Sequence, residues 1–156
     1  MARLKVLALA VATGRIGYAF FDGKELKDWG GSAKASQSRK RAIKQAERWI
    51  DCMRPDVVVT EDVKQACRKG ARSKRLIAAL ADLSNNLPLM DVSVRRNQSF
   101  SNKYDEAKAL AVRYPTLLPW IPRRPRIWEH EPYRMIYFEA VALALGMMEP
   151  PNEPAH

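Results

Sequence analysis

Three consecutive valines, Val57 to Val59, constrain the fold of this sequence more than any other feature. Successive side chains of a strand point to opposite faces of its sheet, so an unbroken run of β-branched residues needs apolar cover on both faces. Such cover is typical of a parallel strand between layers of helices. The run follows Arg54-Pro55, which ends a predicted helix, and it leads into Glu61-Asp62. We therefore expect an α/β domain with a central parallel strand over residues 56–60.

Strand and helix patterns alternate on either side of this run. Apolar segments joined at Thr13-Gly14 and Asp22-Gly23 predict an antiparallel meander, because these pairs favour tight hairpin turns. Together with the spacing of apolar residues, the turns predict strands over 4–11, 16–21, 24–29, 56–60 and 87–94, and helices over 37–53, 73–85, 104–113 and 133–148. This order predicts a mixed five-stranded sheet flanked by helices. We expect one domain over residues 1–148 and a flexible Pro-rich tail over 149–156.

The chain is strongly basic: its 156 residues carry 27 Lys and Arg against 17 Asp and Glu, a net charge of +10. Such an excess fits a nucleic-acid partner, an anionic membrane surface, or solubility alone. The longest apolar runs are too short to cross a bilayer, and no basic amphipathic helix carries a row of large apolar residues. We interpret the short apolar run after the N-terminus as a strand of a cytoplasmic protein from a bacterial or phage-infected cell, rather than as a secretory signal.

Cysteine and histidine do not form a metal-binding pattern here. Cys52 and Cys67 are too few and too widely spaced for a zinc framework, and His130 has no partner at a ligand spacing. We expect both cysteines to be reduced and largely buried.

The largest basic cluster directly follows Glu61. A charged run usually forms a solvated face, but this one adjoins a candidate acidic site, as a track for a phosphate backbone would. Gly70 indicates a loop that leads into the start of a helix, which also favours anions. Nucleic-acid binding is therefore the preferred interpretation, with candidate DNA-binding residues Lys64, Arg68, Lys69, Arg72, Lys74 and Arg75.

Two acidic residues, Glu61 and Glu139, lie at informative positions. Glu61 closes the central strand, so it should lie at the carboxyl edge of the sheet, where ligands bind in such folds. Glu139 lies in a helix that is apolar nearly all round, so its buried carboxylate needs a cation or hydrogen-bond donors. The simpler alternatives are a solvated loop start for Glu61 and a salt bridge to Arg113 or Arg134 for Glu139. Together the two acids suggest a divalent-metal site, because Mg²⁺ prefers carboxylate oxygens and two ions can clamp a phosphodiester.

Three segments in this order resemble the RuvC family of Holliday-junction resolvases, which are RNase H-like nucleases. They are VLALAVATGRIGYAFFDG, PDVVVTEDV with the basic segment after it, and EAVALALG in the last helix. The resemblance extends over residues 5–147. It implies an RNase H-like fold, a homodimer, two Mg²⁺ or Mn²⁺ ions in each active site, and symmetric nicking of four-way DNA junctions.

The resemblance also implies roles for individual residues. Glu61 and Glu139 match two of the metal-binding catalytic acids, with Glu139 standing where the family usually has Asp. Lys103 matches a lysine that approaches the scissile phosphate, although a lysine at the start of a helix is often just exposed. His130 or Glu131 is a candidate for a missing ligand from the loop before the last helix.

Ala10 stands where the family has the first-strand Asp that binds both ions, and Ile136 where it often has a further acid. One interpretation is a non-catalytic module that binds branched DNA. The other is a nuclease in which this Asp has been replaced, and it is favoured because the Thr13-Gly14 and Gly17-Tyr18 patterns nearby remain. We predict a metal-dependent junction endonuclease that is inactive with Ala10.

The loop before the last helix is rich in aromatic residues. Trp120, Trp128, Tyr133 and Tyr137 fit two interpretations. They can stack on unpaired bases at a junction, as aromatic side chains do in proteins that bind single strands. We prefer the other interpretation, in which they pack the Pro-rich loop onto the last helix.

Overall fold

The computed structural model describes residues 3–63, 69–96, 100 and 102–149. The predicted roles of Lys64 and Arg68, the burial of Cys67 and all of the predicted tail beyond Glu149 lie outside these residues. Among the helices of the described residues, none is both long enough and apolar enough to cross a membrane.

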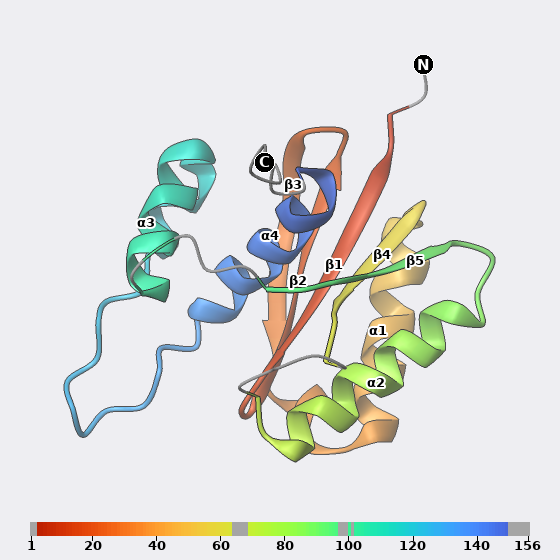
Figure 1. The fold of residues 1–156 in the computed structure, drawn as a ribbon, viewed down its shortest axis with the longest axis horizontal. Coiled ribbons are helices and arrows are strands. Elements are labelled where there is room, and N and C mark those ends of the chain that lie inside the picture. The colour runs from red at the N-terminus through yellow and green to blue at the C-terminus, as the bar shows by residue number, and fades with distance from the viewer. Residues whose placement is uncertain (1–2, 64–68, 97–99, 101, 150–156) are drawn as a thin grey trace, which may run out of the picture.

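A single mixed sheet of five strands lies at the centre of the molecule (Figure 1). The antiparallel meander consists of β1 (Lys5–Ala12), β2 (Arg15–Asp22) and β3 (Glu25–Ser32). β4 (Val57–Glu61) runs parallel to β1, and β5 (Met90–Val94) runs parallel to β4. The order across the sheet is β3-β2-β1-β4-β5. The predicted mixed five-stranded sheet is confirmed.

The helices agree with the predicted ones to within a few residues. They are α1 (Arg39–Met53), α2 (Ala71–Asn85), α3 (Lys103–Arg113) and α4 (Met135–Met148), with short 3₁₀ helices at η1 (Lys34–Gln37) and η2 (Pro115–Trp120). The first helix was predicted to begin at Gln37, but Ser38 is extended and its Oγ accepts a hydrogen bond from the Arg41 N–H at 3.1 Å. This N-cap separates α1 from η1.

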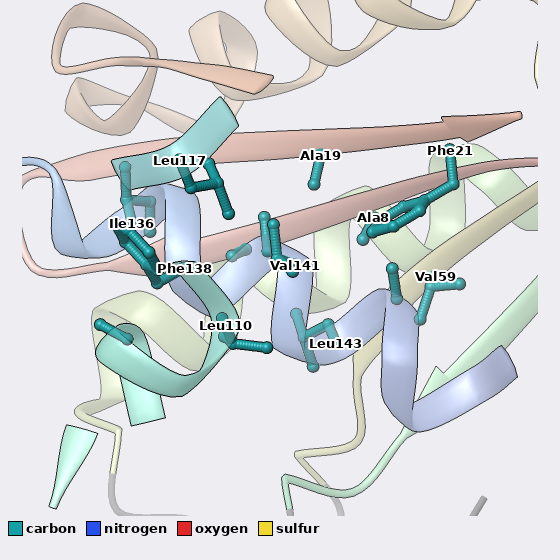
Figure 2. Close-up of a cluster of buried hydrophobic side chains, with 14 of the residues drawn as sticks. Ala8, Ala19, Phe21, Val59, Leu110, Leu117, Ile136, Phe138, Val141 and Leu143 are labelled. Carbon is teal, nitrogen blue, oxygen red and sulfur yellow. The ribbon is translucent and has the colours of Figure 1, made fainter. Parts of the chain in front are cut away.

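Each face of the sheet has its own apolar core, as the run of valines requires. Alternate residues of β1 and β4, including Leu7 and Val58, pack against α1 and α2. Their neighbours, including Ala8 and Val59, face the side covered by α4 and α3. In Figure 2, Val141 of α4 lies among Ala8, Ala19 and Val59 of the sheet. α4 is therefore buried on several sides, which is why its sequence is apolar nearly all round.

One strand boundary and one prediction of burial need correction. The strand predicted over 87–94 begins only at Met90, and Met90 is 61% exposed because β5 is an edge strand with one neighbour. Only Val92 and Val94 of β5 are partly buried. Cys52 is exposed rather than buried. It lies on α1 away from the buried stripe of Ala42, Ala46 and Ile50.

α4 approaches the sheet closely at Gly17 of β2. A Cβ atom at this position would lie 2.6 Å from Cγ1 of Ile136 and 3.1 Å from the backbone oxygen of Gly30. Gly17 pairs with Ala10 across the β1–β2 ladder, so both positions are small beneath the first turn of α4. The absence of a side chain at Gly17 therefore sets how close the helix lies.

We expect Gly17→Ala to lower the free energy of unfolding by about 1–3 kcal/mol, because the added methyl group overpacks the contact with Ile136. Denaturant titration measures this change. Gly70→Ala is the comparison variant, since a Cβ there meets nothing within 4 Å and only the weaker N-cap of α2 should lower stability, by about 0.5 kcal/mol. Equal stabilities of the two variants would contradict the close approach of α4.

Candidate active site

Glu61 and Ala10 lie on the same face of the sheet. The parallel ladder pairs Val6 with Val57 and Ala8 with Val59, and two further residues along each strand lead to Ala10 and Glu61. Because side chains alternate with a period of two, both residues point to the side covered by α4. Ala10 is 2% exposed. An acidic side chain at position 10 would thus enter the same space as the carboxylate of Glu61.

Lys69 joins the two acids that the sequence singled out. Its Nζ lies 3.4 Å from Oε2 of Glu139 on α4 and 3.8 Å from Oε1 of Glu61 at the end of β4. The same ammonium donates a hydrogen bond to the backbone oxygen of Val11 at 2.6 Å. All three side chains are largely buried. One positive charge therefore lies where the ends of β1 and β4 meet α4.

A third carboxylate enters from the loop before α4. Glu131 forms ion pairs with Lys103, at the start of α3, and with Arg15, at the start of β2. Lys103 Nζ also lies 3.9 Å from Oε1 of Glu139. Lys103 is thus part of the cluster instead of being only an exposed residue at the start of a helix. Glu139 is paired with Lys69 and Lys103, whereas Arg113, proposed as its alternative partner, pairs with Glu149.

These groups line one open cavity of about 790 Å³, which we call the carboxylate cleft. Its basic side chains are at least as numerous as its acidic ones. Glu61, Glu131 and Glu139 carry the negative charge together with Asp62, and Arg15, Lys69, Arg95, Arg96 and Lys103 the positive charge. The cleft can therefore hold an anionic group against several fixed cations.

Arg96 adds positive charge at the wall of the cleft. Burial alone would lower its pKa, but the hydrogen bonds and the charge of Glu106, with the charges of Glu139 and Glu61, outweigh burial and raise the pKa of the guanidinium. Its Nη2 donates to Oε1 of Glu106 at 2.8 Å. Arg96 consequently remains a permanent cation within the field of the two central acids.

The other predicted DNA-binding residues lie on α2, beyond Lys69. Arg72 donates hydrogen bonds to the backbone oxygens of Ser36 and Gln37, at 3.2 and 2.9 Å, and so connects α2 to η1. Lys74 is half-buried and Arg75 is exposed. The structure brings Glu61, Glu139, Lys69 and Lys103 together but leaves these three residues outside the cleft lining.

Arg15 was missed in the sequence, and Glu131 was only a secondary candidate there. Arg15 could have been singled out in the sequence because it is a charged residue at the start of a mostly apolar strand. Its guanidinium is largely buried, donates to the Thr13 backbone oxygen at 3.3 Å and pairs with Glu131. Arg15 thereby fixes the loop before α4 at the mouth of the cleft.

The side chains of the cleft do not fit a pair of divalent ions. Ala10 offers no oxygen ligand, and the oxygens of Glu61 and Glu139 already face the Lys69 ammonium. Among the described residues, no group of three or more His, Cys, Asp or Glu side chains is arranged to hold a metal ion. Each Mg²⁺ ion is usually held by one or two carboxylates together with water and phosphate oxygens, and Ala10 supplies no carboxylate, so the two-ion site implied by the family resemblance is not assembled around Ala10.

Lys69→Met tests the role of the ammonium, because it removes the charge and retains much of the apolar stem. We expect the free energy of unfolding to fall by about 1–3 kcal/mol, since two buried carboxylates lose their shared cation. Added Mg²⁺ should then raise the melting temperature of Lys69→Met more than that of the parent chain. Lys44→Met, on the exposed surface of α1, is the control. Equal Mg²⁺ responses of all three chains would contradict competition between Lys69 and a cation.

No protein-family model matches this chain, and the comparison with curated proteins gave no match. Similar solved structures do exist. Fowlpox virus resolvase in complex with substrate Holliday junction DNA has a TM-score of 0.59 and 14% identity, over 94% of this chain and 97% of that one. Thermus thermophilus RuvC has a TM-score of 0.55 and 14% identity, over 91% and 92% of the two chains. The predicted RuvC-like form of the RNase H-like fold is thereby confirmed, and the chain shares its architecture with Holliday-junction resolvases.

Proposed function

We propose that this chain recognises branched DNA, above all four-way junctions, and that it is a junction endonuclease by type in which Ala10 prevents efficient cleavage. The carboxylate cleft carries this proposal, because it brings Glu61, Glu139, Lys69 and Lys103 to one edge of the sheet. The fold is shared with resolvases, one of which has been solved in complex with its substrate Holliday junction DNA.

The charge of the cleft supports a DNA partner. Lys103 is 37% exposed at its side chain, so its ammonium can exchange Glu131 for a phosphate oxygen. Arg95 and Arg96 follow β5 directly and line the same cleft as Lys103. Phosphates bound by such groups release counterions, which supplies much of the affinity of proteins for DNA. The surrounding carboxylates limit how deeply a phosphate can enter.

Cleavage in the related form would depend on position 10. With Asp there, we propose that this residue, Glu61 and Glu139 hold two Mg²⁺ or Mn²⁺ ions, and that Lys103 approaches the scissile phosphate. We also propose a homodimer, because a two-fold symmetric junction is matched by a two-fold symmetric protein. With Ala10 the set of metal ligands is incomplete, so we propose no metal-dependent cleavage by this chain.

A second candidate function is a non-catalytic module that binds branched DNA. The position of Lys69 favours it, because the ammonium offsets part of the negative charge of Glu61 and Glu139 without a metal. In that case the cleft is complete as it stands and serves only to bind DNA.

Binding preference tests the proposal as a whole. We expect the chain to bind a four-way junction at least about tenfold more tightly than a duplex of the same length, a difference of about 1.4 kcal/mol. Gel shifts with junction, duplex and RNA–DNA hybrid, without divalent ions and at several salt concentrations, measure this preference. The logarithm of the affinity should fall linearly with the logarithm of salt concentration. Equal affinity for junction and duplex would argue against a resolvase-type protein.

Ala10→Asp distinguishes the two candidate functions. We expect this variant to nick junction strands symmetrically in Mg²⁺, about 100-fold or more above the parent chain, because metal affinity and activity fall 10–100-fold even when outer-shell partners are lost. Ala10→Asn is the matched control, since it has the same shape without the charge, and should stay inactive. Combining Ala10→Asp with Lys69→Met shows whether the ammonium blocks the ions.

Each result of this series has a definite meaning. Rapid Mg²⁺-dependent cleavage by the parent chain would refute the role given to position 10. An Ala10→Asp variant that binds junctions but does not cut them, with or without Lys69→Met, would favour the binding module.

A further inference from the structure

The loop over residues 121–134 joins η2 to α4 and extends away from the sheet at the lower left of Figure 1. We call it the projecting loop. Its far end returns to the carboxylate cleft, because His130 and Glu131 line that cavity. The ion pairs of Glu131 with Arg15 and Lys103 hold this end in place.

Two adjacent apolar side chains are the most exposed large ones on the projecting loop. Ile127 is fully exposed, and Trp128 is 76% exposed. Single exposed apolar residues are common, but adjacent bulky ones on a segment that leads into a cleft often belong to a binding site. The other aromatic residues of this region behave differently.

Trp120, Tyr133 and Tyr137 pack against one another as the sequence suggested. The ring centroid of Tyr137 lies 6.1 Å from that of Trp120 and 6.1 Å from that of Tyr133, both with edge-to-face geometry. Arg134 lies over the Trp120 ring at 5.3 Å. The packing prediction is therefore right for these three residues. It is wrong for Trp128, whose side chain is exposed to solvent.

The turn that carries Trp128 is structured. The Glu129 N–H donates to the backbone oxygen of Arg126 at 2.9 Å, and the Arg126 N–H donates to Oε1 of Glu129 at 3.2 Å. The Arg126 guanidinium lies 5.6 Å from the centroid of the Trp128 ring. These contacts restrict the backbone of the turn, and Arg126 covers one side of the Trp128 ring. Because the side chain is already ordered, less conformational entropy is lost when a ligand binds to the ring.

The charge around the turn matches a polyanion. Arg123, Arg124 and Arg126 are exposed on the same loop, and the neighbouring acid Glu129 lies beside Arg126. Arginine planes and indole rings both stack on nucleobases, and every base has an aromatic face. Trp128 is three residues from Glu131, so their Cα atoms lie at most about 10 Å apart.

We propose that the Ile127-Trp128 turn is a second DNA-contacting site, at which Trp128 stacks on an unpaired nucleobase near the branch point while Arg123 and Arg124 bind the flanking phosphates. This inference rests on the proposed function, because it places the branch point beside the carboxylate cleft, which His130 and Glu131 of the same loop line. It assigns the preference for branched over fully paired DNA to this loop.

Trp128→Ala, Trp128→Phe and the control Leu118→Ala test this site. Leu118 is an exposed apolar residue on η2 of the same Pro-rich region. Affinities are measured for a four-way junction and a duplex, and 2-aminopurine at the branch point reports changes in base stacking. We expect Trp128→Ala to lose junction affinity about tenfold or more, with duplex affinity unchanged. The binding-dependent change in 2-aminopurine fluorescence should disappear with Trp128→Ala and persist with Trp128→Phe and Leu118→Ala.

Several outcomes would overturn the inference. Unchanged junction affinity of Trp128→Ala, or an equal loss on junction and duplex, would exclude base stacking at a branch point. Loss of self-association, measured by sedimentation, with DNA affinity intact would assign the turn to a protein interface. If the parent chain prefers junctions and Trp128→Ala keeps this preference, the stacking site is refuted and the proposed function is not. Absence of that preference in the parent chain refutes the proposed function.

Discussion

The burial of Glu139 on an apolar helix is the constraint around which the site is organised. α4 packs against the sheet through Ile136 and Val141, and the Glu139 carboxylate between them is largely buried. Removing this charge from water costs free energy. The cost is offset by cations that other elements bring to the same point. Lys69 comes from the segment before α2, and Lys103 from the start of α3. The acid on α4 thus determines where Lys69 and Lys103 come together.

An ammonium and a divalent ion are different solutions to the same electrostatic problem. Lys69 supplies one charge and a few directed hydrogen bonds, so it compensates Glu61 and Glu139 without activating water. A divalent ion would supply a larger charge but would have to displace the ammonium from the oxygens of Glu61 and Glu139. In the proposed function DNA would be a further competitor, since phosphates attract the same lysines. The occupancy of the cleft is therefore set by competition among carboxylates, phosphates and cations.

Periodicity and turn signals were enough to predict the sheet and the positions of Glu61 and Glu139. Both predictions depend on local pattern: a run of valines ends at the sheet edge, and an acid interrupts an apolar helix. The link through Lys69 was not predictable, because in the sequence this residue belongs to a basic run typical of a solvated face. Arg15 was missed for a similar reason, since its partner Glu131 is 116 residues away. Such long-range pairs follow from how helices pack on the sheet, which composition and spacing do not encode.

Position 10 links the packing of the fold to its chemistry. Ala8, Ala10 and Ala12 present small side chains to the face beneath α4, and Gly17 opposite Ala10 lets Ile136 approach. A carboxylate at position 10 would enter this tight region and need a cation of its own. Lys69 already bonds to the backbone of Val11, the next residue, so its ammonium is the nearest candidate. An acid at position 10 would therefore draw Lys69 from Glu61 and Glu139 or require a metal in its place. In the proposed function, this choice separates a protein that binds DNA from one that cuts it.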